Sequence, residues 1–186
     1  MVRIIAGTAR GRKLETLEGM ETRPTLDRVK EAVFGSLQFR IPYSTVLDLF
    51  AGSGNLGLEA LSRGAKRAVL NDRNAACVAI IRRNIETLGF SEAARTMNLD
   101  YTAAIDRLQS DGEAFDLVFL DPPYREGISE DAVRRLFEQR LILPGGTVVL
   151  EHAAELVPKD EPGVDRVKRT KRFGKCGYSL IEEDGE

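Results

Sequence analysis

Cysteine and histidine are scarce in this chain, and their scarcity excludes several kinds of site. The sequence holds two cysteines, Cys77 and Cys176, and one histidine, His152. A structural zinc site needs about four nitrogen or sulfur ligands, often with paired cysteines, so we expect no metal site. The two cysteines lie far apart in the sequence, which also argues against a framework of secreted disulfides.

Long apolar runs and a large net charge are missing as well. No run of about 18 apolar residues occurs, and the N-terminus lacks the apolar segment of a signal peptide. We therefore expect a cytoplasmic protein that does not associate with membranes, and we take a monomer as the default oligomeric state. An apolar fraction of 42% supports a hydrophobic core, whereas a formal net charge of −2 names no partner.

The basic residues are unevenly distributed despite this small net charge. Residues 1–13 carry four basic residues and no acid, and residues 166–175 carry six basic residues and no acid. Either block can be an ordinary solvated surface. Two acid-free basic blocks at opposite ends of the chain are also what a divided phosphate-binding surface needs.

Strand and helix patterns alternate from Thr45 onward. Apolar, β-branched runs over residues 45–50, 67–72, 94–99, 115–121 and 145–152 predict strands, and the amphipathic segments between them predict helices. Two further runs, residues 165–173 and 177–183, predict a closing antiparallel pair. The pattern predicts an α/β fold with a mostly parallel seven-stranded sheet, an antiparallel C-terminal strand and helices on both faces.

The first 40 residues follow a different pattern. Residues 2–14 predict a short N-terminal β-hairpin extension, and residues 25–37 predict a helix that Thr25 can cap. We divide the chain into an N-terminal extension of a basic hairpin and a helix, residues 1–40, and a second domain, residues 41–186, that contains the alternating strands and helices. We expect the core not to need residues 1–13, so that their arginines project into solvent.

A glycine pattern follows the first predicted strand. Gly52, Gly54 and Gly57 form G-x-G-x-x-G ahead of a helix, and Asp72 ends the second strand. Glycine lets the backbone approach a ligand closely, and a helix N-terminus offers free N–H groups to an anion. A carboxylate at the end of the second strand can accept both hydroxyls of a ribose. The pattern predicts a ribonucleoside cofactor, and NAD, FAD and S-adenosylmethionine (SAM) all fit it.

Three further polar residues complete the expected cofactor site. Asp48 stands just before the glycine loop, and a buried acid there needs a partner, so we place it near the amino acid moiety of the cofactor. Ser53 lies within the loop. Asp100 follows the third strand, where it either contacts the adenine or only caps the next helix.

The fourth predicted strand ends in Asp121-Pro122-Pro123-Tyr124. An exocyclic amine on a base is a poor nucleophile because its lone pair is delocalised into the ring. Asp121 and the carbonyl of Pro122 can each accept one N–H and so aim the nitrogen at a methyl donor. The prolines keep the loop rigid, and Tyr124 can stack on a base turned out of its helix. The motif predicts methylation of an exocyclic amine; a strand stop with a tyrosine lid is the alternative.

These motifs resemble those of the amino-methylating SAM-dependent methyltransferases. The segments RIIAGTARGRKL, RPTLDRVKEAVF, VLDLFAGSGNLGLEALSRGA and FLDPPY are together similar to the RsmD-like bacterial 16S rRNA guanine-N2 methyltransferases. The resemblance covers nearly the whole chain and implies a Rossmann-like class I fold with SAM as cofactor. It also implies methylation of the N2 amine of a guanine in 16S rRNA, of the guanine 966 class, within a small-subunit ribonucleoprotein particle.

The same resemblance assigns individual roles. It implies that Gly52, Gly54 and Asp72 bind SAM and that residues 121–124 hold the target guanine. It implies that the hairpin and residues 23–30 grip rRNA, and the basic residues that we expect to do so are Arg10, Arg12, Lys13 and Arg23. One departure is Asp72 itself, since such families often have a glutamate there, which is longer by one methylene.

Three other functions are compatible with parts of the sequence. A DNA adenine-N6 methyltransferase would use the same catalytic residues, but it normally has a separate target-recognition region that this short chain lacks. A nicotinamide-dependent oxidoreductase would explain Asp72 but leaves residues 121–124 without a role. A non-enzymatic RNA-binding protein on a degenerate methyltransferase fold would not need an intact catalytic motif.

Overall fold

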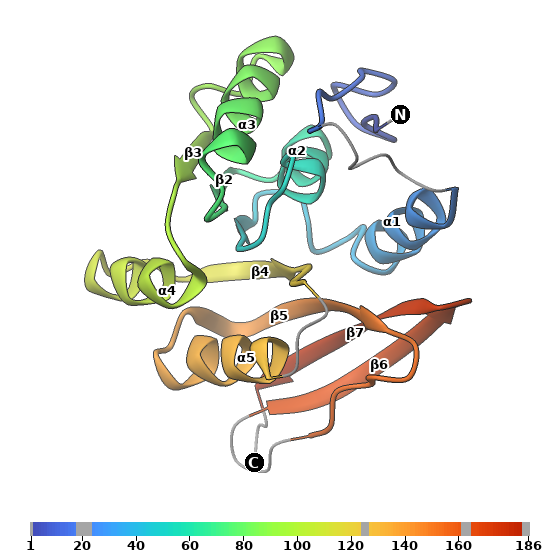
Figure 1. Cartoon of the computed structure of the whole chain (residues 1–186), viewed down its shortest axis with the longest axis vertical. Helices are drawn as coiled ribbons and strands as arrows, with labels where there is room; N and C mark the ends of the chain where they lie inside the picture. Colours follow the sequence, from blue (N-terminus) through green and yellow to red (C-terminus); the bar gives the residue numbers. More distant parts are fainter. Residues whose placement is uncertain (1, 18–23, 124–126, 161–164, 184–186) are drawn as a thin grey trace.

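A computed structural model describes residues 2–17, 24–123, 127–160 and 165–183 (Figure 1). The predictions for Arg23 and Tyr124 lie outside these residues. Every helix within the described ranges is too short or too polar to cross a membrane.

Seven strands form one sheet in the order β3-β2-β1-β4-β5-β7-β6. Their bounds are β1 Thr45–Asp48, β2 Arg67–Asn71, β3 Ala94–Met97, β4 Phe115–Leu120, β5 Ile142–Ala153, β6 Asp165–Phe173 and β7 Cys176–Glu183. Neighbours from β3 to β5 pair in parallel, whereas β7 is antiparallel to both β5 and β6. The α/β fold with a mostly parallel seven-stranded sheet is therefore confirmed. The strand order reverses direction between β1 and β4, which places a switch point there.

Within the residues that the structure describes, five helices cover the two faces of this sheet (Figure 1). They are α1 Pro24–Ser36, α2 Asn55–Ser62, α3 Ala75–Leu88, α4 Tyr101–Ser110 and α5 Ile128–Glu138. Helices α1, α2 and α3 share one hydrophobic cluster, whereas α4 and α5 share the other. Neighbouring strand residues alternate between the clusters, so that Val46 packs with α1 to α3 and Leu47 packs with α4 and α5.

The N-terminal segment folds back on itself, but the hairpin is minimal. A single antiparallel bridge joins Arg3 to Lys13, and the Ile4 N–H donates to the Arg12 carbonyl at 2.9 Å. The buried apolar side chains of this segment pack into the cluster of α1 to α3; they are Val2, Ile4, Ala9 and Leu14. The expectation that the core does not need residues 1–13 is wrong, because Val2, Ile4 and Ala9 are buried in this cluster.

Helix α2 holds this segment through the side chain of Glu59 and the backbone of Ser62. The carboxylate of Glu59 accepts the backbone N–H groups of Ile5 at 2.8 Å and Ala6 at 3.0 Å. The backbone carbonyl of Ser62 accepts the Thr8 N–H at 2.8 Å. Gly7 lies between these contacts with φ +84°, and a Cβ there would stand 1.7 Å from the Ser62 carbonyl oxygen. Only glycine therefore fits this close approach of two backbones.

A buried ion pair connects α1 to α2. The Lys30 ammonium lies 2.9 Å from the Glu59 carboxylate, and both side chains are nearly inaccessible to solvent. Lys30 also donates to the Arg3 carbonyl at 2.9 Å and to the Asn55 side chain at 2.6 Å. The expectation that residues 23–30 contact rRNA is therefore wrong for Lys30, whose ammonium is buried and bonded to Glu59, Arg3 and Asn55 instead.

Candidate active site

A cavity of about 620 Å³ opens beyond the carboxyl ends of β1, β2 and β4. This position is the switch point of the sheet, and the volume suits a nucleotide-sized ligand. The predicted site residues that line it are Gly52, Ser53, Asp72, Asp100, Asp121, Pro122 and Pro123. The fold thus brings residues from four separate segments of the sequence to one cleft.

Two predicted cofactor residues lie behind the cleft wall. Gly54 is buried with φ +83°, and a Cβ there would stand 2.9 Å from a Leu58 side-chain atom. Asp48 is almost fully buried, and it accepts the Gly57 N–H at 2.9 Å. Both residues shape the turn from β1 into α2, and Asp48 borders a smaller cavity that adjoins the cleft.

Asp72 connects β2 to the glycine loop. Its two carboxylate oxygens accept the Gly52 N–H at 2.9 Å and the Asn74 N–H at 2.8 Å. The side chain is half-buried and lines the cleft. A carboxylate oxygen has two lone pairs, so both oxygens retain acceptor capacity toward a ligand in the cleft.

Asn71, at the end of β2, is a polar residue with a buried side chain, and its hydrogen bonds account for its position. Its buried amide donates to the carbonyls of Leu49 at 3.1 Å and Leu99 at 3.0 Å, and its oxygen accepts the Leu99 N–H at 3.2 Å. The side chain therefore fastens the chain after β1 to the chain after β3. Both of these segments line the cleft, so Asn71 stabilises its walls from below.

Asp100 caps α4 and also lines the cleft. Its carboxylate accepts the Thr102 N–H at 3.1 Å and the Thr102 hydroxyl at 2.9 Å. The capping role is thus confirmed. The contact with adenine stays a prediction, which the position of Asp100 on the cleft wall permits.

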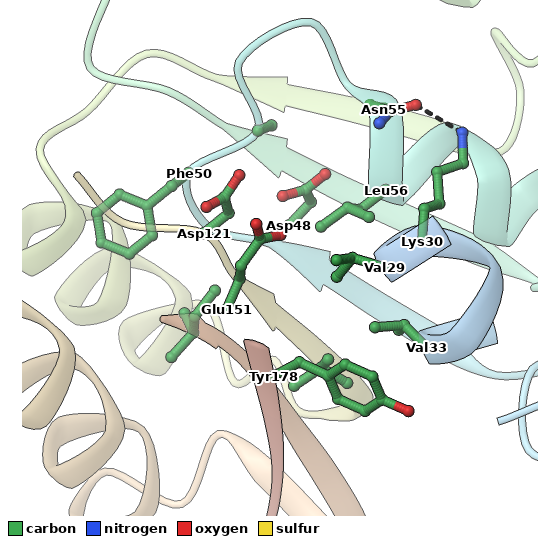
Figure 2. Close-up of a pocket in the computed structure, with 13 residues that line it drawn as sticks. Val29, Lys30, Val33, Asp48, Phe50, Asn55, Leu56, Asp121, Glu151 and Tyr178 are labelled. Atoms are coloured by element: carbon green, nitrogen blue, oxygen red, sulfur yellow. Dashed lines mark hydrogen bonds between the residues drawn. The ribbon is translucent and has the colours of Figure 1, made fainter. Parts of the chain in front are cut away.

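Three carboxylates converge where the cleft meets the smaller cavity of about 90 Å³. Figure 2 shows Asp48, Asp121 and Glu151 pointing toward one another from the ends of β1, β4 and β5. Lys30 borders the same cavity, but its ammonium is directed toward Asn55 and Glu59. The acids therefore face each other without a cation between them among the described side chains.

Burial shifts the titration of all three acids. Desolvation raises the pKa of Asp48 to about 7, with the charges of Asp121 and Asp72 adding to the rise and the Gly57 N–H opposing it. Desolvation and the charge of Asp121 raise the pKa of Glu151 to about 8. Desolvation also raises the pKa of Asp121, to about 6. The three carboxyl groups together are therefore partly protonated near neutral pH.

Sequence reasoning missed Glu151 and Asn55. Glu151 is an acid near the carboxyl end of a strand, the same signal that identified Asp48, Asp72 and Asp121. Asn55 begins α2 directly after the glycine loop and lines both cavities. Its contact with Lys30 had no signal in the sequence, because the two residues lie on different helices.

The predicted RNA-binding residues occupy the surface of the N-terminal segment. Arg10 and Lys13 are exposed. Arg12 is exposed too, but one of its guanidinium N–H groups donates to the Thr87 carbonyl at the end of α3, at 2.7 Å. Arg12 therefore also fastens the N-terminal segment to the fold.

Comparison with known proteins identifies relatives along the whole chain. The family model described as "Conserved hypothetical protein 95" matches residues 2–182. A Haemophilus influenzae protein named "Ribosomal RNA small subunit methyltransferase D" is 40% identical, with 97% of this chain and 93% of that protein covered. The solved structure of yhhF from Escherichia coli is 31% identical with a TM-score of 0.86, covering 100% of this chain and 99% of that one.

A more distant solved structure shares the fold. It is a T. thermophilus 16S rRNA N2 G1207 methyltransferase in complex with AdoMet and guanosine. The TM-score is 0.67 at 22% identity, and the match covers 91% of this chain and 45% of that chain. This likeness shows a shared fold, the Rossmann-like α/β architecture that the sequence predicted.

Proposed function

The chain belongs to the conserved hypothetical protein 95 family, and on that basis we propose that it is a SAM-dependent methyltransferase acting on the N2 amine of a guanine in 16S rRNA. The relative from Haemophilus influenzae supports small-subunit rRNA as the substrate class. The observation that carries the proposal is the meeting of the glycine loop, Asp72 and Asp121-Pro122-Pro123 in one cleft.

The residues of the cleft fit SAM better than a nicotinamide cofactor. SAM carries positive charge on its sulfonium and ammonium groups, and three acids converge beside the cleft. We assign the ribose hydroxyls to Asp72, the adenine to the wall near Asp100, and the amino acid moiety to Asp48 and the loop of Gly52 and Ser53. When bound, SAM supplies an electrophilic methyl group.

Asp121 and the Pro122 carbonyl orient the attacking amine. Each accepts one N–H of the exocyclic nitrogen, which turns its lone pair toward the methyl group. As the new N–C bond forms and the S–C bond breaks, the nitrogen must lose a proton. The Asp121 carboxylate accepts that proton, a role that suits its pKa of about 6. Pro123 keeps this loop rigid, and Tyr124 stacks on the base.

Glu151 gives the site a second acceptor beside Asp121. The Watson–Crick edge of guanine presents N–H donors at both N1 and N2, whereas adenine presents an acceptor at N1. When both are ionised, these two neighbouring carboxylates favour guanine over adenine. A protonated Glu151 can instead donate to N1 of adenine, and its pKa is raised to about 8, so the preference for guanine develops as the pH rises through about 8. This argument favours the guanine-N2 reaction over the adenine-N6 reaction, although both use the same Asp-Pro-Pro-Tyr motif.

The remaining parts of the proposal concern the surroundings of the reaction. Residues 1–40 serve as an RNA-binding extension through Arg10, Arg12, Lys13 and Arg23, and residues 41–186 form the catalytic domain. The protein acts as a monomer in the cytoplasm on a small-subunit ribonucleoprotein particle. The exposure of Arg10 and Lys13 supports the RNA contact.

Two measurements test this function. Calorimetry should detect SAM binding and no NAD binding, since the acids that converge beside the cleft suit the cationic SAM. Transfer of a radiolabelled methyl group should occur to small-subunit particles and not to duplex DNA. A protein that binds NAD but not SAM would falsify the methyltransferase proposal. Radiolabel found in the adenine of DNA would show that the substrate is DNA and not rRNA.

A further inference from the structure

Strand β6 forms one edge of the sheet and presents a row of cations. The exposed basic residues of β6 and the turn after it are Arg166, Lys168, Arg169, Lys171, Arg172 and Lys175. Lys168 lies 4.0 Å from Glu182. Within the described ranges, four of these cations make no ion pair; they are Arg169, Lys171, Arg172 and Lys175.

The sheet register places these cations beside the active site. Glu151 of β5 pairs with Tyr178 of β7, which pairs with Lys171 of β6. Likewise, His152 of β5 pairs with Gly177 of β7, and Gly177 pairs with Arg172 of β6. Adjacent strands lie roughly 5 Å apart, so Lys171 and Arg172 stand only two strand spacings, about 10 Å, from the end of β5. The cleft and the basic edge therefore form adjacent parts of one end of the sheet.

The sheet is firmly packed beneath this edge. Phe173 stacks on Tyr178 with ring centroids 6.2 Å apart. Tyr178 is fully buried, and its hydroxyl contacts the Ala32 carbonyl at 3.0 Å and the Ser36 hydroxyl at 2.8 Å in α1. A rigid support lowers the entropic cost of fixing the neighbouring cations on a ligand.

Charged residues on an edge strand prevent it from pairing with another chain, but this explains only part of the row of cations on β6. A charged residue or two on an edge strand is enough to prevent pairing with another chain. Four unpaired cations within seven residues repel each other, which costs stability unless a polyanion binds. Most other arginines of the sheet and helices make ion pairs; examples are Arg63, Arg67, Arg95 and Arg107.

We propose that this basic edge, formed by Arg169, Lys171, Arg172 and Lys175, binds the phosphate backbone of the rRNA that delivers its base to the cleft. The inference rests on the proposed function and adds a second RNA-binding surface to it. RNA bound along the edge would cross β7 and reach the cleft beside Glu151. Arginine suits the contact because its planar fork makes two charge-assisted hydrogen bonds to a phosphate.

The test compares two double variants that remove the same charge. Lys171→Ala/Arg172→Ala removes two cations beside the cleft. Lys66→Ala/Arg140→Asn removes two exposed, unpaired cations at the opposite end of the sheet, and asparagine tolerates the positive φ of 56° at residue 140. Binding to a 16S rRNA transcript is measured between 50 mM and 200 mM salt, with SAM affinity and melting temperature as controls.

Each phosphate contact adds roughly 0.7–0.9 to the slope of log K against log salt. The basic-edge variant loses two cations, so its slope should be flatter by about one to two units. Its KM for methyl transfer should rise while kcat and SAM affinity stay unchanged, because the edge touches neither the cofactor nor the amine. The Lys66/Arg140 variant should match the wild type. If alanine at the edge impairs folding, Lys171→Gln/Arg172→Gln retains most of each side chain and carries the same test.

Three results would overturn the proposal. One is a wild-type salt slope and KM in the basic-edge variant. Another is an equal loss in the Lys66/Arg140 variant, which would mean that only total charge matters. The third is weaker binding to the assembled particle with unchanged binding to the naked transcript, which would make the partner a protein. Failure of the proposed function is distinct, since the wild type would then transfer no methyl group even where the edge binds rRNA.

Discussion

The carboxylate of Asp72 accepts the Gly52 N–H at 2.9 Å, so the acid at the end of β2 holds the glycine loop that follows β1. Replacing it in Asp72→Ala should weaken SAM binding by roughly 1.5–3 kcal/mol, the usual value of a hydrogen bond to a charged group. Both the ribose contact and the loop position are lost. Isothermal calorimetry with SAM measures the effect.

The Asp72→Asn variant separates these two contributions. Its side-chain oxygen can still accept the Gly52 N–H, so the loop should stay in place while the charge is lost. We expect an affinity between those of the wild type and Asp72→Ala. Wild-type SAM affinity in Asp72→Ala would contradict the role of Asp72.

Asp100 offers a test of the adenine contact. Serine keeps the cap of α4, whereas alanine loses it, so Asp100→Ala should lower the free energy of unfolding by about 1 kcal/mol and Asp100→Ser by much less. Both variants should weaken SAM binding by about 0.5–1.5 kcal/mol, because both remove the carboxylate from the cleft. Unchanged SAM affinity in Asp100→Ser would reduce Asp100 to a helix cap.

The three converging acids should make SAM binding depend on pH. Because the pKa values of Asp121, Asp48 and Glu151 are raised to about 6, 7 and 8, the group gains negative charge between about pH 6 and 8. The affinity for cationic SAM should rise over that window, with release of protons that calorimetry detects as a dependence on buffer ionisation enthalpy. Glu151→Gln should weaken this pH dependence of SAM binding.

S-adenosylhomocysteine lacks the sulfonium charge, so its affinity should depend less on pH than that of SAM. An equal pH dependence for the two ligands would contradict this account.

The same acids should make the ligand-free protein less stable at high pH. Their pKa values are raised on folding, so the folded state binds more protons than the unfolded state above about pH 4. The stabilisation is fully present below that pH and is lost as pH rises through about 6 to 8. The melting temperature should therefore fall between pH 5 and 8.5, and fall less in Glu151→Gln. An identical pH dependence in the two proteins would contradict the assignment.

Gly7 and Gly11 form a matched pair of positions in the N-terminal segment. Both have φ near +80°, but a Cβ at Gly7 would collide with the Ser62 carbonyl, whereas a Cβ at Gly11 would meet nothing within 4 Å. Gly11→Ala should cost about 1–2 kcal/mol of stability from the backbone conformation alone. Gly7→Ala should cost about 1–3 kcal/mol more, from the collision. Urea unfolding measures both, and equal losses would contradict the docking of this segment on α2.

Much of the fold could be predicted because the relevant signals are local. Alternating apolar runs and helical patterns predicted each strand and helix of the sheet. Acids after apolar runs identified Asp48, Asp72 and Asp121, and the parallel sheet then brought them together because the carboxyl ends of its strands share an edge. Whether those residues bind SAM and the target amine stays a prediction.

The features that the sequence did not reveal depend on partners distant in the chain. Lys30 lies in the segment 23–30 that the resemblance assigned to rRNA, and its burial against Glu59 depends on the packing of α1 on α2. The N-terminal segment looked like a free extension, since nothing local indicates that Glu59 and Ser62 hold its backbone. Residues 166–175 appeared only as a charge block until pairing through β7 placed them beside Glu151.

The most direct test of the central claim is the identity of the methylated nucleoside. Small-subunit particles are incubated with radiolabelled SAM, and their 16S rRNA is digested and separated. The wild type should yield N2-methylguanosine. Asp121→Ala should keep SAM binding, weakened only by the loss of one of the three converging charges, and yield almost none, because the amine is no longer oriented. Label in another nucleoside, or near-normal turnover by Asp121→Ala, would contradict the account of this site.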